Sequence, residues 1–197
     1  MDKRNLILDA MLHLLENEQG ASCSVSDIAQ TAGIGKGSIY YYFKSKEEIF
    51  DALVEREYNQ IILKCEELID QSHADALQKF KLLFQSYCSS VSFPAMDAYL
   101  HRPQNSAIHQ KSLAKILSSL SPLVAALIRQ GVEEKIFQCA APQETAEIFV
   151  SVFCFLYDPG IFAWTPQQLK DKAVALASLF EKGLSSKEGS FQFLFQL

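Results

Sequence analysis

Proline and glycine are scarce in this chain, with six and eight among 197 residues. Because these residues interrupt helices and mark turns, their scarcity favours long helices. Long apolar runs are also missing: the longest nearly continuous one, residues 148–157, has ten residues, about half of the roughly 20 that a membrane-spanning helix needs. The start of the chain has neither the apolar stretch nor the cleavage site of a signal peptide. We therefore expect a soluble, cytoplasmic protein that does not enter a membrane.

Sequence patterns of catalysis and of metal binding are absent as well. The chain has no G-x-S-x-G, C-x-x-C, G-x-G-x-x-G or P-loop pattern, and its four histidines lack metal-ligand spacing. Gly33, Gly35 and Gly37 alternate, but the strand that a dinucleotide fingerprint needs does not precede them. The five cysteines are an odd number without a close pair, which is typical of reduced thiols. These absences predict a protein that is not an enzyme and has neither a metal nor a cofactor.

The chain does contain apolar residues at spacings of three and four, the pattern of amphipathic helices. We expect a kink or restart at Ser121-Pro122 and a helix end at Gly131, whereas Ser24, Ser45 and Thr165 start helices as N-caps. No segment shows the alternation of a strand, so the predicted fold is all-α. The expected helices cover about residues 6–15, 24–32, 36–43, 45–69, 74–92, 105–130, 142–157 and 166–183.

Two short helices joined by a glycine-bearing turn, after a packing helix, are the outline of a helix-turn-helix. The third segment adds weight, because Ile39 and Phe43 can anchor it inward while a basic, tyrosine-bearing face stays exposed. Residues 33–46 contain three lysines and no acidic residue, although the chain has a net charge of −5. Lysines and tyrosine hydroxyls bind phosphate oxygens, so the pattern favours DNA binding through this element. The exposed face holds Lys36, Gly37, Tyr40, Tyr41 and Lys44.

The segments 24–29 (SVSDIA) and 32–49 (AGIGKGSIYYYFKSKEEI) resemble the DNA-binding domain of TetR-family transcriptional regulators. The resemblance implies a helix-turn-helix domain over residues 1–46 and a larger helical domain for ligand binding and dimerisation over residues 47–197. Two positions depart from the family pattern: Ser26 stands where a longer side chain is common, and Gly35 replaces a serine. The resemblance assigns DNA contacts to Ser24, Ser26, Gly35, Lys36, Gly37, Ser38, Tyr40, Tyr41, Tyr42, Lys44 and Lys46. For Tyr42, core packing remains a second interpretation.

The aromatic residues after position 46 form most of the expected core, and some of them can line a ligand pocket instead. Thirteen of the fourteen phenylalanines lie in this part. The family architecture implies a pocket for a small hydrophobic or amphipathic ligand, and core packing is the alternative for each residue. The expected ligand contacts are Phe84, Tyr87, Cys88, Tyr99, His109, Phe153 and Tyr157.

The segments 142–157 and 166–183 look apolar on nearly every side, which predicts burial against both the chain itself and a second subunit. The resemblance implies a homodimer through a four-helix interface, and we expect Ala146, Phe149, Ala173, Ala177 and Phe180 in it. The tail 191–195 (FQFLF) is unusually apolar for a terminus. Packing on the body or on the dimer partner, and occupying a partner's pocket, are both open.

Together these patterns predict a dimeric regulator, most simply a repressor, that binds a palindromic double-stranded DNA operator and is released by a hydrophobic small molecule. Two alternatives remain. One is a protein of the same fold that organises DNA or binds a protein partner without a small ligand. The other is an enzyme that uses the aromatic region, which the lack of any nucleophile–base pattern disfavours.

Overall fold

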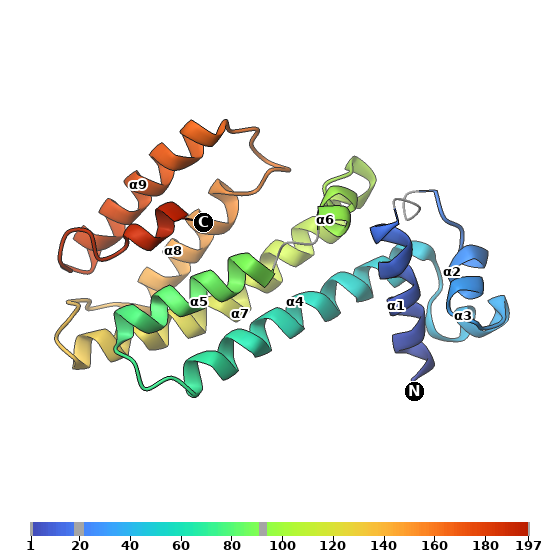
Figure 1. The fold of residues 1–197 in the computed structure, drawn as a ribbon, viewed down its shortest axis with the longest axis horizontal. Coiled ribbons are helices and arrows are strands. Elements are labelled where there is room, and N and C mark those ends of the chain that lie inside the picture. The colour runs from blue at the N-terminus through green and yellow to red at the C-terminus, as the bar shows by residue number, and fades with distance from the viewer. Residues whose placement is uncertain (1, 18–21, 91–93, 197) are drawn as a thin grey trace. The chain divides into compact units, whose positions relative to one another are not determined.

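The computed structural model describes residues 2–17, 22–90 and 94–196, and these form helices joined by short loops (Figure 1). No strand occurs among the described residues, and the all-α prediction is confirmed. The chain divides into two compact units. Unit 1 comprises Met1–Gln60 and Ser92–Ser112, and unit 2 comprises Ile61–Val91 and Leu113–Leu197.

Unit 1 is built around α1, which packs on two other helices. The first helix, α1, contacts α2 and α6, and α2 contacts α3. Ile7, Leu8 and Met11 of α1 are fully buried, as are Ile28 of α2 and Phe50 of α4. The helices of this unit are α1 (Lys3–Glu16), α2 (Val25–Thr31), α3 (Lys36–Tyr42), the first part of α4 (Lys46–Asp70), α6 (Pro94–Leu100), the 3-10 turn η1 (Pro103–Asn105) and the first residues of α7 (Ser106–Glu133).

The unit that contains the helix-turn-helix is larger than the expected domain, residues 1–46. Helix α4 continues without a break from Lys46 to Asp70, and its first apolar residues, Ile49 and Phe50, are buried. The segment 92–112 also joins this unit, where α6 packs on α1. A boundary at residue 46 would therefore separate a packed helix from its own core.

The helix starts follow the expected capping chemistry with one variation. Ser24 and Asp27 form a reciprocal capping box at α2, and Thr165 and Gln168 form another at α9. At α4 the Ser45 hydroxyl accepts from the Glu48 backbone N–H. The Glu48 carboxylate, however, accepts from the backbone N–H of Lys44, at 2.6 Å.

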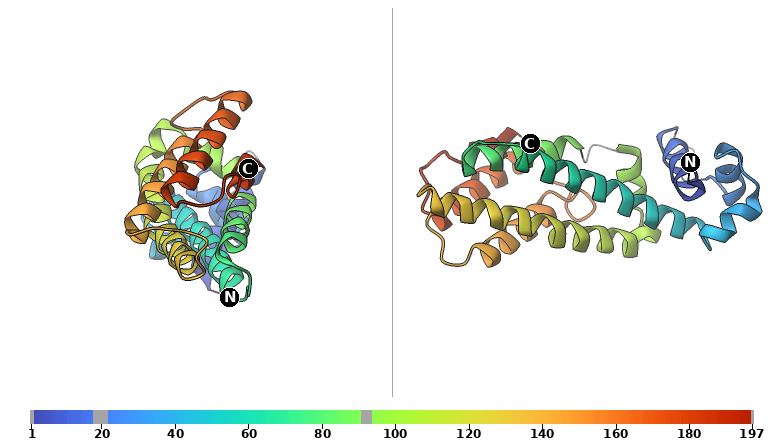
Figure 2. Two further views of the ribbon diagram at one scale, coloured as in Figure 1. Left: turned by 90° about the vertical axis from the view of Figure 1, so that its left-hand side faces the viewer. Right: turned by 90° about the horizontal axis from the view of Figure 1, so that it is seen from below.

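Unit 2 contains the remaining parts of α4 and α7, which run alongside α5 (Figure 2). Phe80 of α5 is at the centre of its core, with the rings of Phe84, Phe137, Phe180 and Phe191 between 5.4 and 6.2 Å away. Burying such rings supplies most of the driving force for folding. The other elements of this unit are α5 (Ala76–Ser90), α8 (Pro142–Leu156), α9 (Pro166–Gly183) and the 3-10 segment η2 (Gln192–Gln196).

One expectation for α7, a helix end at Gly131, is wrong, and of the expected kink or restart at Pro122 the restart is not found. The helix passes through Pro122 without interruption, and it ends at Glu133 rather than at Gly131. Gly131 is needed for another reason: a Cβ at this position would overlap the ring of Phe137, which folds back onto the helix. The chain reverses after α7 at Lys135, whose φ is +61°.

One stretch, Pro103–Glu133, is long and apolar enough by composition to cross a membrane. The search for continuous apolar runs in the sequence did not indicate it. However, 44% of its most apolar window is buried inside the protein. Core helices of proteins that do not enter membranes pass the same test, so this helix is weak support for a membrane segment.

Candidate functional site

The turn between α2 and α3 has a conformation that favours glycine. Gly33 has a φ of +67°, which side chains disfavour. Its backbone N–H donates to the Gln30 carbonyl, and that of Ile34 donates to the Ala29 carbonyl. These bonds satisfy carbonyls at the end of α2. The turn thereby fixes the direction in which α3 leaves α2.

Helix α3 is anchored by one side and presents the other to solvent. Ile39 and Phe43 are 1% and 3% exposed, as expected, whereas Tyr40 and Tyr41 are 52% and 84% exposed. Tyr42 is half-buried, with its ring edge-on to that of Tyr41 at 5.0 Å. Each of these tyrosines offers an apolar ring and a hydroxyl group, a combination that is enriched at interfaces. This face is available to a partner.

The expected face of α3 needs one correction. The helix ends at Tyr42, and Phe43 is extended with φ −140° and ψ 137°. Lys44 is exposed but lies in the loop after the helix. Helical spacing from Lys36 therefore does not show that the two lysines share a face. Lys36 itself is exposed in the first turn of α3.

Lys46 is held by groups inside unit 1. Its Nζ donates to the Cys23 carbonyl at 2.8 Å and lies 5.5 Å from the centre of the Tyr99 ring. The ammonium has three N–H donors, so it can also bind a phosphate. Lys46 therefore fixes the start of α4 against the residue that precedes the cap of α2.

The glycines and serines that are expected to contact DNA are mostly exposed. Gly35 is the N-cap of α3 and provides no side-chain hydrogen bond, and a Cβ at Gly37 would meet nothing within 4 Å. The Ser24 hydroxyl is engaged with Asp27. Hydrogen bonds from Ser24 lower the pKa of the Asp27 carboxyl. Of the other two serines, Ser26 is exposed and Ser38 is half-buried.

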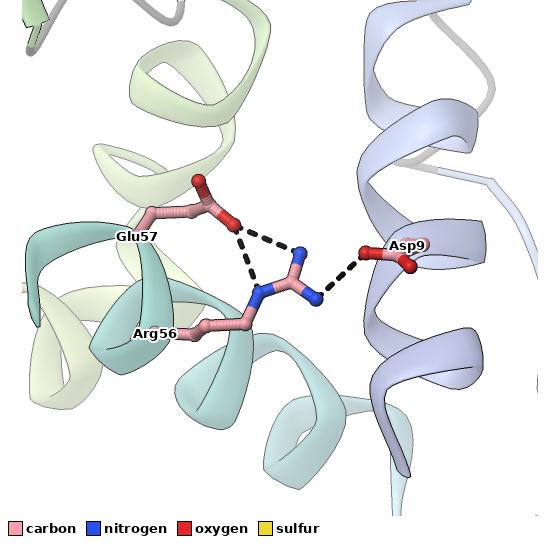
Figure 3. Close-up of polar contacts among 3 residues, drawn as sticks. All are labelled: Asp9, Arg56 and Glu57. Carbon is pink, nitrogen blue, oxygen red and sulfur yellow. Dashed lines mark hydrogen bonds and ion pairs between the residues drawn. The ribbon is translucent and has the colours of Figure 1, made fainter. Parts of the chain in front are cut away.

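An ion-paired cluster that the sequence analysis missed joins α1 to α4 (Figure 3). One guanidinium nitrogen of Arg56 is 2.7 Å from Asp9 of α1, and another is 2.8 Å from the neighbouring Glu57. Glu57 is only 6% exposed. Helical spacing could have placed Glu57 on the inward side of α4, but the contact of Arg56 with Asp9, 47 positions away, could not be found from the sequence.

Five of the seven expected ligand contacts belong to unit 2. Phe153 lies among three of them, with ring-centre distances of 5.0 Å to Phe84, 6.4 Å to Tyr87 and 5.2 Å to Tyr157. Cys88 interacts electrostatically with Tyr157. The structure therefore brings these five side chains together.

This group of side chains is apolar and neutral. Burial raises the pKa of Cys88, Cys154 and Tyr157 to about 12 each, so all three keep their protons at neutral pH. Thiols of this kind are poor nucleophiles, which disfavours thiolate chemistry here. The hydroxyl oxygen of Tyr157 is buried and has no hydrogen-bond partner among the described residues.

The other two expected ligand contacts, Tyr99 and His109, belong to unit 1. The Tyr99 ring packs edge-on against Phe50 at 4.6 Å, between the cations of Lys46 and Arg102. The His109 ring contacts that of His101 at 4.6 Å. In unit 1, Tyr99 therefore connects α6 to the start of α4.

All five residues expected at the dimer interface are buried inside the subunit. Because Ala146, Phe149, Ala173, Ala177 and Phe180 pack in the core of unit 2, a second subunit cannot contact them without rearrangement. The two helices expose other apolar side chains. These are Ile148, Val152 and Phe155 on α8 and Leu179 on α9, and we call these four residues the exposed apolar face. Val174 of α9 is exposed as well, but it lies roughly 140° around the helix from Leu179. Nor is α9 apolar on every side, since Lys170 and Asp171 are exposed.

Comparison with known proteins supports the same assignment at both ends of the chain. A sequence model of the bacterial regulatory proteins of the tetR family matches residues 7–53. A model of the tetracyclin repressor-like C-terminal domain matches residues 92–179.

One relative and one solved structure match nearly the whole chain, and a second relative matches about two thirds of it. YhgD, an HTH-type transcriptional regulator of Bacillus subtilis, is 22% identical over 192 residues, which cover 94% of this chain and 98% of the relative. The fatty acid metabolism regulator protein of Bacillus subtilis is 27% identical over 130 residues, covering 64% of this chain and 66% of the relative. The structure of the fatty acid degradation regulator FadR from Bacillus halodurans superposes with a TM-score of 0.59 at 20% identity, covering 99% of this chain and 95% of that chain.

Regulators of this family bind DNA and dimerise. With its helix-turn-helix, its all-helical fold and family matches in both halves, this chain belongs to the TetR family of transcriptional regulators.

Proposed function

We propose that this protein is a dimeric repressor that leaves a palindromic operator when an apolar small molecule binds in unit 2. The observation that carries the proposal is the exposed face of α3, where Lys36, Tyr40 and Tyr41 face solvent. No acidic residue occurs between Gly33 and Lys46. Two such helices, placed about one DNA turn apart, roughly 34–36 Å, enter successive major grooves.

The salt dependence of operator binding tests which lysines contact phosphates. Lys36→Ala and Lys46→Ala are each expected to weaken binding to all sequences similarly and to flatten the salt slope by about one unit. Lys170→Ala, which removes an exposed lysine of α9, is the matched control and is expected to leave the slope unchanged. Fluorescence anisotropy across a salt series measures all three. An unchanged slope for Lys46→Ala would restrict that lysine to its bond with the Cys23 carbonyl.

A substitution at Gly37 can distinguish an effect on DNA binding from an effect on folding. Nothing within 4 Å would meet an added Cβ, so Gly37→Ala is expected to raise the free energy of unfolding by roughly 0.5 kcal/mol. Operator affinity is expected to fall several-fold, because the methyl group would stand between α3 and the DNA. Gly183→Ala, also with open space around it, is the control for stability alone. Undiminished operator binding by Gly37→Ala would show that the backbone does not approach DNA there.

The neutral, ring-lined group around Phe153 supports an apolar ligand. Rings of Phe84, Tyr87 and Tyr157 surround it, and the Tyr157 hydroxyl is available to one polar group of a ligand. Two similar proteins are named for regulating fatty acid metabolism and degradation. Compounds with acyl chains are therefore the first to test for release of the operator.

Tyr157→Phe is expected to affect the ligand and not the fold. The variant loses one neutral hydrogen bond to the ligand, worth about 0.5–1.5 kcal/mol or roughly 2- to 13-fold in affinity. Because the hydroxyl has no partner among the described residues, the free energy of unfolding is expected to stay equal or to rise. Titration of the operator complex with an inducer measures the first effect, and urea unfolding measures the second. Equal release curves would remove Tyr157 from the ligand contacts.

Signal transfer is proposed to use α4. This helix is continuous from Lys46 to Asp70 and contributes to both units, and Arg56 ties it to α1. A ligand shifts the protein from its DNA-binding conformation to one that does not bind DNA only to the extent that it binds the second conformation more tightly than the first.

A further inference from the structure

The chain reverses after α9 and returns along that helix. Ser185 and Gly189 have φ angles of +50° and +85°, and the backbone N–H of Ser186 donates to the Glu181 carbonyl. The 3-10 segment η2 (Gln192–Gln196) then packs against α9. The reversal brings three phenylalanines of the C-terminal segment, at positions 191, 193 and 195, back to unit 2.

The first of them is an anchor. Phe191 is fully buried, and its backbone N–H donates to the buried carboxylate of Glu181 at 2.9 Å. Its ring lies 4.8 Å from Phe180, 5.4 Å from Phe80 and 5.9 Å from Phe137. Phe191 is therefore part of the hydrophobic core of unit 2.

The residues after the anchor, 192–196, form what we call the tip, and they are held differently. Phe193 and Leu194 are buried, and the Phe193 ring lies 6.4 Å from that of Phe84. Phe84 in turn contacts Phe153, in the group of proposed ligand contacts. A short 3-10 turn has poorer hydrogen-bond geometry than an α-helix and separates from its body more easily.

The tip also borders a partly open groove of about 650 Å³ between α9 and the returning segment. Val174, Ser178 and Lys182 line it from α9, and Gln192 and Phe195 line it from the tip. Its opening to solvent gives the tip room to move away from Phe84.

We propose that the tip is a built-in occupant of the aromatic ligand site, and that an apolar ligand binds by displacing Phe193 and Leu194. This inference rests on the proposed ligand-responsive function and adds its regulation. The ligand class it selects is one with an alkyl or aryl group comparable in size to these two side chains. While the tip is seated, the apparent affinity for such a ligand is lowered by the fraction of molecules in which the site is open.

The test uses a chain shortened after Phe191, which keeps the anchor, and the fluorescent probe N-phenyl-1-naphthylamine. The shortened chain is expected to bind the probe about tenfold more tightly than the full chain. A peptide with the sequence of residues 190–197 is expected to compete with the probe. Gln192→Ala, which alters an exposed residue of the tip, is the control and is expected to match the full chain.

Circular dichroism measures whether the shortened chain keeps its helices. If the helices are lost, the full-length Phe193→Ala variant takes the place of the shortened chain in the titration. Phe153→Leu in the shortened chain is expected to weaken probe binding, because the site includes that ring. Equal probe affinity of the shortened and full chains, or no effect of Phe153→Leu, would overturn the proposal.

If ligands release the operator equally from both chains, the tip is not an occupant while the proposed function stands. If the tip competes with the probe but no ligand affects operator binding, the occupancy stands and the ligand response fails.

Discussion

Ile148→Glu and Leu179→Glu are each expected to convert the protein from a dimer to a monomer and to abolish high-affinity operator binding. The two side chains are 66% and 68% exposed in the subunit, so a glutamate there leaves the core intact. In a dimer formed through the exposed apolar face, the carboxylate would be buried without a partner. Such burial costs about 3–5 kcal/mol, which weakens association by more than about 100-fold. A single helix-turn-helix then binds only one half of a palindrome.

Leu63→Glu is the matched control for this prediction, because Leu63 is 56% exposed but lies on α4. Sedimentation velocity is expected to show a dimer for Leu63→Glu and a monomer for the other two variants, with unchanged helicity in all three. If Ile148→Glu and Leu179→Glu both sediment as dimers, the interface does not use α8 and α9.

Arg56→Ala is expected to lower the free energy of unfolding by about 2–3 kcal/mol, since it leaves the Glu57 carboxylate buried without its cation. This range is below the one for a fully buried pair, because the Arg56 side chain is 18% exposed. Asp9 is 59% exposed at its side chain, so Asp9→Ala is expected to cost less than about 1 kcal/mol. Urea unfolding measures both.

The double variant Arg56→Met with Glu57→Gln is expected to recover more than half of the loss, because neither charge then remains in the core. Equal destabilisation by Arg56→Ala and Asp9→Ala would show that the Glu57 carboxylate finds compensation elsewhere.

The helix-turn-helix was predictable from the sequence because its signals are local. A capping box at Ser24, a glycine in the αL turn at position 33 and inward residues at 39 and 43 each act within a few positions. The end of α3 was placed one residue too late, at Phe43, whose backbone is extended and whose side chain is buried.

The side of each C-terminal helix that faces the core was not predictable in the same way. Both sides of α8 are apolar, and the internal one is the side on which Phe149 packs against Phe180, at a ring distance of 3.9 Å. The residues expected at the interface therefore lie on the internal side of the two helices, as their burial shows. Tyr99 likewise packs on Phe50, 49 positions away, which no local pattern indicates.

The most direct test of the central claim is selection of DNA by the purified protein from a random-sequence pool, followed by sequencing of the bound fraction. The account predicts enrichment of a palindrome whose half-sites are centred about one helical turn apart, roughly 10 base pairs. The Leu179→Glu protein is expected to lose that enrichment. Recovery of DNA without any enriched sequence, or of the same palindrome by the Leu179→Glu protein, would contradict it.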